Sequence, residues 1–222
     1  WQSKDPVLRY RSEVLASGSA TESELKALEE ELAAYVLESL NAALDEPKPE
    51  YDEHVELSDV YAPVSDGPTH EFPPASDRKI RLIDAIKEGM EQAMERHENL
   101  VLMGQDIAEY GGVFKATDGF VDRFGLQRVR NTPLCESAIV GAGVGLSVEG
   151  FKAMVEMQFS DFVTEAMTQI CNQAAKLHYR WGQRADLVIR MPTGAGVVAG
   201  PFHSQSTEAW FARVPGLKVV YP

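Results

Sequence analysis

Glycine at every second position from Gly141 to Gly145 constrains this chain more than any other feature. The run lies in a stretch of small residues, and an apolar segment, Ala153 to Met157, follows it and predicts a buried strand. Glycines in a helix let a neighbouring element approach closely, so tight helix packing explains the run best. A dinucleotide fingerprint is excluded, because Val148 replaces the third glycine and we expect no strand before the run.

Glu136 opens this predicted helix, and the polar turn Asn131 to Pro133 leads into it through Leu134 and Cys135. A helix N-terminus favours the charged form of a carboxylate, whereas apolar neighbours favour the neutral form. Such a balance suits a group that shares a proton with a ligand. The alternative is that Glu136 is only a first-turn acid that completes the helix start, and the pattern leaves both interpretations open.

The charge of the chain is divided unevenly. Residues 1–77 carry 5 Lys and Arg against 18 Asp and Glu, whereas residues 78–222 carry 16 of each. The chain therefore joins two segments of different character. Excess acidic charge disfavours nucleic acid as a partner, because that affinity comes from neutralising phosphates, although most such charge is simply a solvated face.

Composition also favours a cytoplasmic protein. We expect no membrane association, because no apolar run is long enough to span a bilayer, and the start WQSKDP does not resemble a signal peptide. The two cysteines, Cys135 and Cys171, form no disulfide framework and are expected to be reduced.

The acidic N-terminal segment predicts helices. Asp5 and Pro6 indicate a helix start with Gly18 as its stop. Thr21 and Glu24 form a capping-box pattern before a second helix that ends at Pro47 and Pro49. That helix carries an apolar stripe and an acidic opposite face, so we infer that it docks on another domain or subunit; the stripe consists of Leu25, Leu28, Leu32, Tyr35, Val36 and Leu40. Arg9 and Arg11 are expected to be ordinary surface charges.

Residues 62–78 are expected to form a linker. Six prolines occur between residues 46 and 77, without a long apolar period. His54 and His70 have no partners at metal-ligand spacing and are expected to be solvent residues.

Residues 79–222 alternate between helical and strand patterns, which predicts an α/β domain with a parallel sheet covered on both faces. The predicted strands are at 100–103, 153–157, 187–189 and 217–220. The predicted helices are an amphipathic helix from Leu82 to Met94, a long helix from Phe162 to Trp181 whose buried stripe runs from Val163 to Trp181, and a short helix within 204–214. Ligands bind such sheets at the carboxyl ends of the strands. The loops after Met103, Gln158 and Pro192 lie at such ends.

His203 and Phe162 are further candidates. His203 lies between a glycine-rich loop and a helix start, and imidazole moves protons near neutral pH, although a lone loop histidine is commonly only a surface residue. Phe162 follows a strand and is expected either to stack on a flat ring or to cap the core.

With these residues in view, residues 79–222 resemble the first half of the β subunit of the thiamine-diphosphate-dependent 2-oxo acid dehydrogenases, the decarboxylating components of the branched-chain and pyruvate complexes. The matching runs are GQDIAEYGGVFKATDG, NTPLCE, EMQFSDF, AAKLHYRWG and HSQSTEAWFARVPGLKVV. Residues 1–61, with KDPVLRYR, TESEL and DVY, resemble the tail of the α subunit. The resemblance implies an α–β fusion whose pyrimidine-binding domain, of three-layer α/β/α architecture, spans 79–222 after a helical acidic segment.

The resemblance also implies site roles. Glu136 would bond the pyrimidine ring of the cofactor and promote its imino form, Phe162 would stack on that ring, and Gln158 would line the pocket. His203 would serve the substrate and the incoming lipoamide. Some members bind potassium through backbone carbonyls at a place that matches Ala185, Leu187 and Val188. The motif for diphosphate and magnesium, GDG followed by asparagine, is absent from these 222 residues, so the magnesium ligands are expected elsewhere.

The implied function is oxidative decarboxylation of a 2-oxo acid, with acyl transfer to lipoamide on an acyltransferase partner. The run HSQSTEA favours branched-chain substrates over pyruvate, and the implied assembly is α2β2 or a dimer of fused chains. Two alternatives stay open: a transketolase-like thiamine-diphosphate enzyme, which assays of ketol transfer would identify, and a non-catalytic acidic interaction module.

Overall fold

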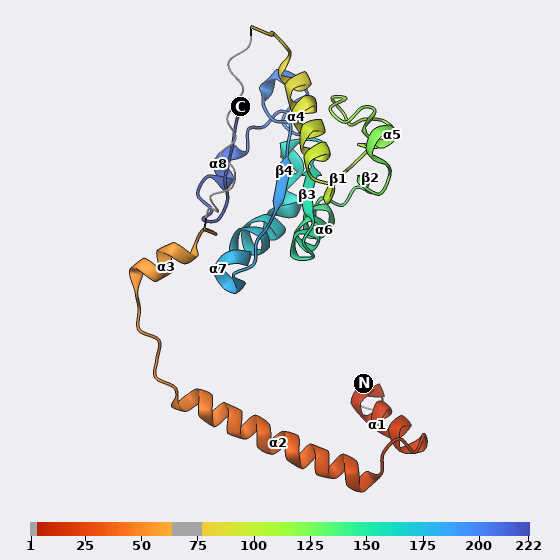
Figure 1. Ribbon diagram of the computed structural model, residues 1–222, viewed down its shortest axis with the longest axis vertical. Helices are drawn as coiled ribbons and strands as arrows, with labels where there is room; N and C mark the ends of the chain where they lie inside the picture. The colour runs from red at the N-terminus through yellow and green to blue at the C-terminus, as the bar shows by residue number, and fades with distance from the viewer. Residues whose placement is uncertain (1–3, 64–76) are drawn as a thin grey trace. The chain divides into compact units, whose positions relative to one another are not determined.

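The structure is a computed structural model that describes residues 4–63 and 77–222 (Figure 1). It divides into two compact units, Trp1–Tyr51 and Asp52–Pro222. The expected linker, 62–78, falls largely outside the described residues, as does His70. Of the helices in the described ranges, none combines the length and the apolar character that crossing a membrane requires.

The first unit begins with α1 (Pro6–Ala16), which starts and stops where the sequence predicts. Asp5 is the N-cap residue, and its carboxylate accepts a hydrogen bond from the Val7 amide at 2.8 Å. Pro6 occupies the first turn, where its missing N–H costs nothing. The chain leaves the helix through Gly18, whose φ of +70° favours glycine.

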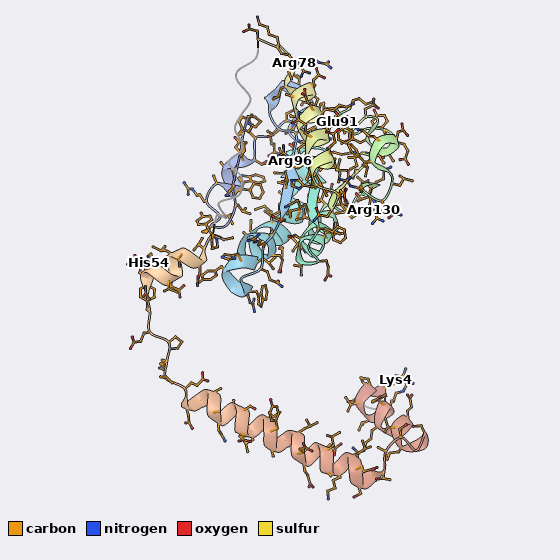
Figure 2. All side chains as sticks on the ribbon, in the orientation of Figure 1. Lys4, His54, Arg78, Glu91, Arg96 and Arg130 are labelled. Atoms are coloured by element: carbon orange, nitrogen blue, oxygen red, sulfur yellow. The ribbon has the colours of Figure 1, made fainter. Side chains whose placement is uncertain are left out.

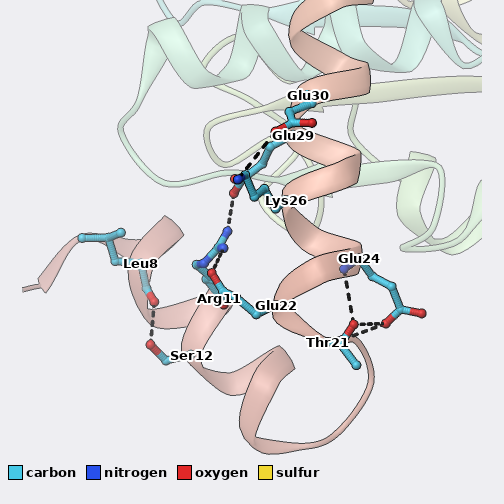
Figure 3. Close-up of polar contacts among 9 residues, drawn as sticks. All are labelled: Leu8, Arg11, Ser12, Thr21, Glu22, Glu24, Lys26, Glu29 and Glu30. Atoms are coloured by element: carbon cyan, nitrogen blue, oxygen red, sulfur yellow. Dashed lines mark hydrogen bonds and ion pairs between the residues drawn. The ribbon is translucent and has the colours of Figure 1, made fainter.

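The predicted capping box opens α2 (Glu22–Asp45). The Thr21 amide donates to Glu24 Oε2 at 2.7 Å, and the Glu24 amide donates to Thr21 Oγ1 at 3.3 Å (Figure 3). The helix ends one residue before Glu46, just ahead of Pro47. None of its residues is buried: Leu25 is half-buried and the rest of the apolar stripe is exposed within this unit, so its docking remains a prediction.

Arg11 corrects one sequence-based expectation, because it is not an ordinary surface charge. Its guanidinium pairs with Glu22 at 2.6 Å and also with Glu29, both on α2 (Figure 3). The side chain is only 26% exposed. Arg11 therefore ties α1 to α2, a contact that helical periodicity within one element cannot reveal.

The second unit is built on four parallel strands in the order β2-β1-β3-β4 (Figure 1). These are β1 (Leu100–Gly104), β2 (Val129–Asn131), β3 (Lys152–Glu156) and β4 (Leu187–Arg190). The parallel sheet is therefore confirmed. The short strand β2 was not predicted, and it precedes the glycine-rich helix, contrary to expectation; the missing third glycine still excludes a dinucleotide fingerprint.

Both faces of the sheet are covered, which confirms the three-layer α/β/α architecture. Alternate residues of β1 point into two separate apolar clusters, because side chains of a strand alternate between faces. Val101 and Met103 join a cluster with Ile139 and Val140 of α6 (Glu136–Val148). Leu100 and Leu102 join another with Met90 and Met94 of α4 (Leu82–Arg96).

Besides the 3-10 helix η5 (Ala195–Val197), two short helices of this unit were not predicted. They are α3 (Glu53–Asp59) and α5 (Phe120–Phe124). The Tyr179 hydroxyl donates to Glu56 of α3 at 2.7 Å, and this hydrogen bond raises the pKa of the Tyr179 phenol. His54 on the same helix is exposed, as expected (Figure 2).

The predicted long helix from Phe162 to Trp181 is helical but not one α-helix. It passes through η2 (Ser160–Ala166, 3-10), η3 (Thr168–Gln173, π), η4 (Ala174–Lys176, 3-10) and α7 (Leu177–Trp181). Trp181 is 56% exposed, so its assignment to the buried stripe was wrong. It lies in the last turn before Gly182, where the chain turns away at φ +66°, and the Arg180 guanidinium covers its ring at 4.5 Å.

The expected last strand, Leu217 to Val220, is not a strand in the structure. Leu217 packs against the core, but Val220 is 83% exposed. An apolar run becomes a strand only when a neighbour supplies a hydrogen-bonded ladder, and this run pairs with no strand of the described sheet. The expected short helix is present as α8 (Glu208–Phe211).

Candidate functional site

The candidate residues gather at one edge of the sheet. In the strand register Gly104 lies beside both Asn131 and Glu156, and Glu156 lies beside Arg190. The four carboxyl ends therefore meet at a single edge, the place where open α/β sheets bind ligands. Each end is followed by candidate residues: Gln105 after β1, Glu136 after β2, residues 158–162 after β3 and the segment to His203 after β4.

Glu136 is the first residue of α6, as predicted. Its Oε1 accepts a hydrogen bond from Gln105 Nε2 at 3.0 Å. The Glu136 side chain is half-buried, and the preceding Cys135 packs against an apolar cluster of the core. The expected carboxylate at a helix start is present, whereas the apolar wall beside it stays a prediction.

Gln105 was missed by the sequence-based search. It is 4% exposed, and its Oε1 has no hydrogen-bond partner within the described ranges. The available signal was its place directly after the buried strand β1, at a carboxyl end where ligands bind. A buried amide that donates to Glu136 fixes one oxygen of that carboxylate and leaves the other for a ligand.

His203 is not a lone loop residue. Its ring lies edge-on to Phe159, with centroids 4.9 Å apart, and edge-on to Phe162 at 5.4 Å. Gln158 precedes this pair and is half-buried, as are Phe159, Phe162 and His203. The structure thus brings two of the predicted site residues, Phe162 and His203, into contact from segments about 40 residues apart.

A buried ion pair lies at the same edge and was also missed. Glu156 is 2% exposed, and Arg190 reaches it through Nε at 3.1 Å and through a terminal guanidinium nitrogen. A Cβ at Gly112 would lie 3.3 Å from Glu156 Oε1, so the loop after β1 closes over this carboxylate. The available signal in the sequence was Glu156 itself, an acidic residue at the end of an apolar strand.

The residues proposed for potassium lie elsewhere. Leu187 and Val188 begin β4 and Ala185 precedes it, so all three are at the amino end of the strand, opposite to Glu136. The Ala185 carbonyl accepts a hydrogen bond from the Leu187 amide at 2.8 Å. Within residues 4–63 and 77–222, no three His, Cys, Asp or Glu side chains gather closely enough to hold a metal ion.

A cavity of about 700 Å³ runs along β4 and is a different feature from this site. Leu187, Ile189, Phe211 and Leu217 contribute to its lining, whereas Glu136, Phe162 and His203 do not. The candidate site is therefore defined by the sheet edge and not by this cavity.

Comparison with known proteins agrees with this geometry. The sequence model described as "Transketolase, pyrimidine binding domain" matches residues 78–222, most of the second unit. The chain belongs to this family. Glu136 follows β2, and the aromatic residues Phe159 and Phe162 follow β3, so both lie after strands that end at the same edge of the sheet.

Individual relatives are similar to nearly two thirds of this chain. The "2-oxoisovalerate dehydrogenase subunit beta" of Bacillus subtilis is 47% identical over 144 residues, 63% of this chain and 43% of the relative. The "2-oxoisovalerate dehydrogenase subunit beta 2, mitochondrial" of Arabidopsis thaliana is 45% identical over 150 residues, 66% of this chain and 42% of the relative.

A relative named for another substrate matches nearly as well. The "Pyruvate dehydrogenase E1 component subunit beta" of Acholeplasma laidlawii is 41% identical over 145 residues, 64% of this chain and 44% of the relative. The chain thus spans less than half the length of each of these relatives.

Proposed function

We propose that this chain is part of a thiamine-diphosphate-dependent 2-oxo acid dehydrogenase, in which Glu136 is the carboxylate that contacts the cofactor. The observation that carries the proposal is Glu136 at the start of α6, held at 3.0 Å by Gln105 at the carboxyl edge of the sheet. The names of the relatives support it, since the first of them are subunits of 2-oxoisovalerate dehydrogenase.

The residues present fit the pyrimidine half of the cofactor. One oxygen of Glu136 is engaged by Gln105, and a carboxylate has further acceptor positions for a ring nitrogen that bears a proton. The buried Oε1 of Gln105, which lacks a partner among the described residues, adds a second acceptor beside it. Phe162 offers a half-buried aromatic face for stacking.

Each residue then has a distinct task. Bound thiamine diphosphate supplies the electron sink for decarboxylation. Glu136 holds and returns a proton at its free oxygen, where the ring nitrogen arrives. Gln158 and Phe162 would orient the ring, and His203, whose ring contacts Phe162, would serve the substrate and the incoming dithiolane.

The wider assembly is part of the proposal. The acyl group would pass to lipoamide on an acyltransferase partner, in an α2β2 assembly or a dimer of fused chains with an α-like tail at 1–61, a linker at 62–78 and the β-like domain at 79–222. Polypeptide outside this chain would bind the diphosphate and the magnesium ion. The carbonyls of Ala185, Leu187 and Val188 would bind potassium.

Branched-chain substrates are favoured because the first relatives are named for 2-oxoisovalerate. Free Cys135 and Cys171 support a cytoplasmic location.

Replacement of Glu136 by glutamine in the full-length protein tests the proposal. We expect Glu136→Gln to abolish decarboxylation of 2-oxoisovalerate and of pyruvate while the melting temperature stays unchanged, because glutamine keeps the volume but cannot exchange the proton. Glu149→Gln is the matched control, since Glu149 is an exposed acid at the other end of α6. Near-normal turnover by Glu136→Gln, or no heat of thiamine diphosphate binding to the wild type, would contradict the proposal.

A further inference from the structure

The main chain of Gln205 is held by side chains from two other segments. Its amide donates to Asp161 Oδ1 at 3.2 Å. Its carbonyl accepts from Thr193 Oγ1 at 2.9 Å and lies 3.2 Å from the Ser160 hydroxyl, which is also 3.1 Å from Thr193 Oγ1. The Gly194 amide donates to the same carbonyl at 3.1 Å. We refer to Ser160, Asp161 and Thr193 as the Gln205 clamp.

Two residues of the Gln205 clamp are buried and Thr193 is half-buried, whereas the loop that precedes Gln205 is exposed. Ser160 is 1% exposed and Asp161 is 9% exposed, whereas residues 195–202 are all exposed. The Ser160 amide also donates to the Pro192 carbonyl at 2.8 Å, which ties the clamp to the end of β4. The exposed loop is therefore anchored where it returns to the core.

The clamp shares one short 3-10 segment with the aromatic rings. Phe159 and Phe162, the rings that contact His203, are three residues apart and fall on one side of a three-residue turn. Ser160 and Asp161 lie between them and hold Gln205, two residues after His203. The same four residues thus supply both the surface against which His203 packs and the anchor that brings it there.

We propose that Asp161, with Ser160 and Thr193, positions His203 against Phe159 and Phe162 by holding the main chain of Gln205. Two residues of extended chain span about 7 Å, so a shift of Gln205 moves His203 with it. Asp161 is a positioning residue, because it acts through Gln205 and not on a ligand. The effect on turnover rests on the function proposed for His203. The packing of His203 against the two phenylalanines is independent of that function.

The chain offers a matched pair of variants. Asp161→Ala removes the acceptor of the Gln205 amide, whereas Asp161→Asn can keep an oxygen in the same place. Asp161 Oδ2 is buried without a hydrogen-bond partner in the described ranges, so the amide of asparagine replaces no existing bond. Thr193→Val removes the second contact at nearly constant volume and serves if Asp161→Ala does not fold.

The first measurement is the rate at which diethylpyrocarbonate modifies His203 in the full-length protein with its partner subunits, followed by peptide mass spectrometry. We expect Asp161→Ala and Thr193→Val to raise this rate about two- to tenfold, the population change that one lost hydrogen bond produces, while Asp161→Asn stays near the wild type. His54, exposed on α3, should react at the same rate in every variant. An unchanged His203 rate in folded Asp161→Ala would overturn the proposal.

The second measurement separates this proposal from the proposed function. Asp161→Ala should lower kcat/KM for decarboxylation and acyl transfer by a similar factor, with recovery in Asp161→Asn. If the wild type lacks this activity, the proposed function fails, and the His203 rates still decide the clamp. If Glu136→Gln is inactive but Asp161→Ala leaves the modification rate of His203 unchanged, the positioning role of the clamp is contradicted and the proposed function stands.

Discussion

The side-chain amide of Gln105 lies 3.0 Å from the carboxylate of Glu136. The two residues are 31 positions apart in the sequence and follow different strands. Gln105 directly follows the buried strand β1, whereas Glu136 begins the helix that follows β2. Because β1 and β2 are paired in parallel, their carboxyl ends adjoin. The contact therefore links the orientation of a candidate catalytic carboxylate to the rigid centre of the sheet.

Removal of the Gln105 amide should reduce activity without removing the carboxylate. We expect Gln105→Leu to lower kcat/KM for decarboxylation by about tenfold or more, since a hydrogen bond to a charged group contributes about 1.5–3 kcal/mol. Steady-state kinetics of the full-length protein measure this. Gln92→Leu is the control, because Gln92 makes an exposed contact with Glu88 at 3.5 Å. Equal activity of the two variants would show that Gln105 does not orient Glu136.

Gly143 should be intolerant of a side chain. A Cβ there would lie 2.8 Å from Leu187 Cδ1 and 3.0 Å from Val155 Cγ1, so these side chains or α6 would have to shift. We expect Gly143→Ala to destabilise the protein by about 1–3 kcal/mol, the usual cost of overpacking. Denaturant unfolding measures the change.

Gly145 provides the opposite result on the same helix. No atom lies within 4 Å of a Cβ at Gly145. Gly145→Ala should therefore stabilise the helix by about 0.5–1 kcal/mol, because alanine loses less conformational entropy. If both alanine variants were equally stable, the glycine run would not serve close helix packing.

The buried pair of Glu156 and Arg190 should depend on both partners. Arg190→Met leaves a nearly inaccessible carboxylate without its cation, and we expect a loss of about 3–5 kcal/mol in the free energy of unfolding. The double variant Glu156→Gln with Arg190→Met should regain most of it. Lys152→Met breaks an exposed pair with Asp186 between neighbouring segments and should cost at most about 1 kcal/mol. A small effect of Arg190→Met would contradict the burial of this pair.

The start of α2 should respond to acid. The hydrogen bonds from the Thr21 amide and hydroxyl hold the pKa of Glu24 below its ordinary value of 4.5. A lowered folded pKa means that this stabilisation is complete above the ordinary value and is lost as the pH falls through the folded value. We expect helix content, measured by far-ultraviolet circular dichroism, to fall in that window.

Two variants isolate the contribution of Glu24. Glu24→Gln should remove its part of the acid transition, because an amide still accepts hydrogen bonds but does not titrate there. Glu31→Gln, an exposed change on the same helix outside the capping box, should leave that part in place. Identical acid transitions in the two variants would contradict a role for the capping box.

The sequence by itself determined those helices and strands that are marked by capping residues or by apolar patterns among neighbouring residues. The caps at Asp5 and Thr21 placed α1 and α2, and the apolar run at 100–103 predicted β1. The glycine run predicted a closely packed α6, and Glu136 was placed at its start. These signals are strong because capping bonds and apolar periodicity involve neighbours along the chain.

Tertiary structure decided which of these residues meet. Only pairing of β1 with β2 brings Gln105 to Glu136, and only packing of the loop after β4 brings His203 to Phe162. The strand pattern at 217–220 could not show that its ladder partner is missing, and the winding of residues 160–176 depends on the core beneath them. Contacts between residues distant in the chain leave no periodic trace, because they arise from the register of strands and the packing of layers.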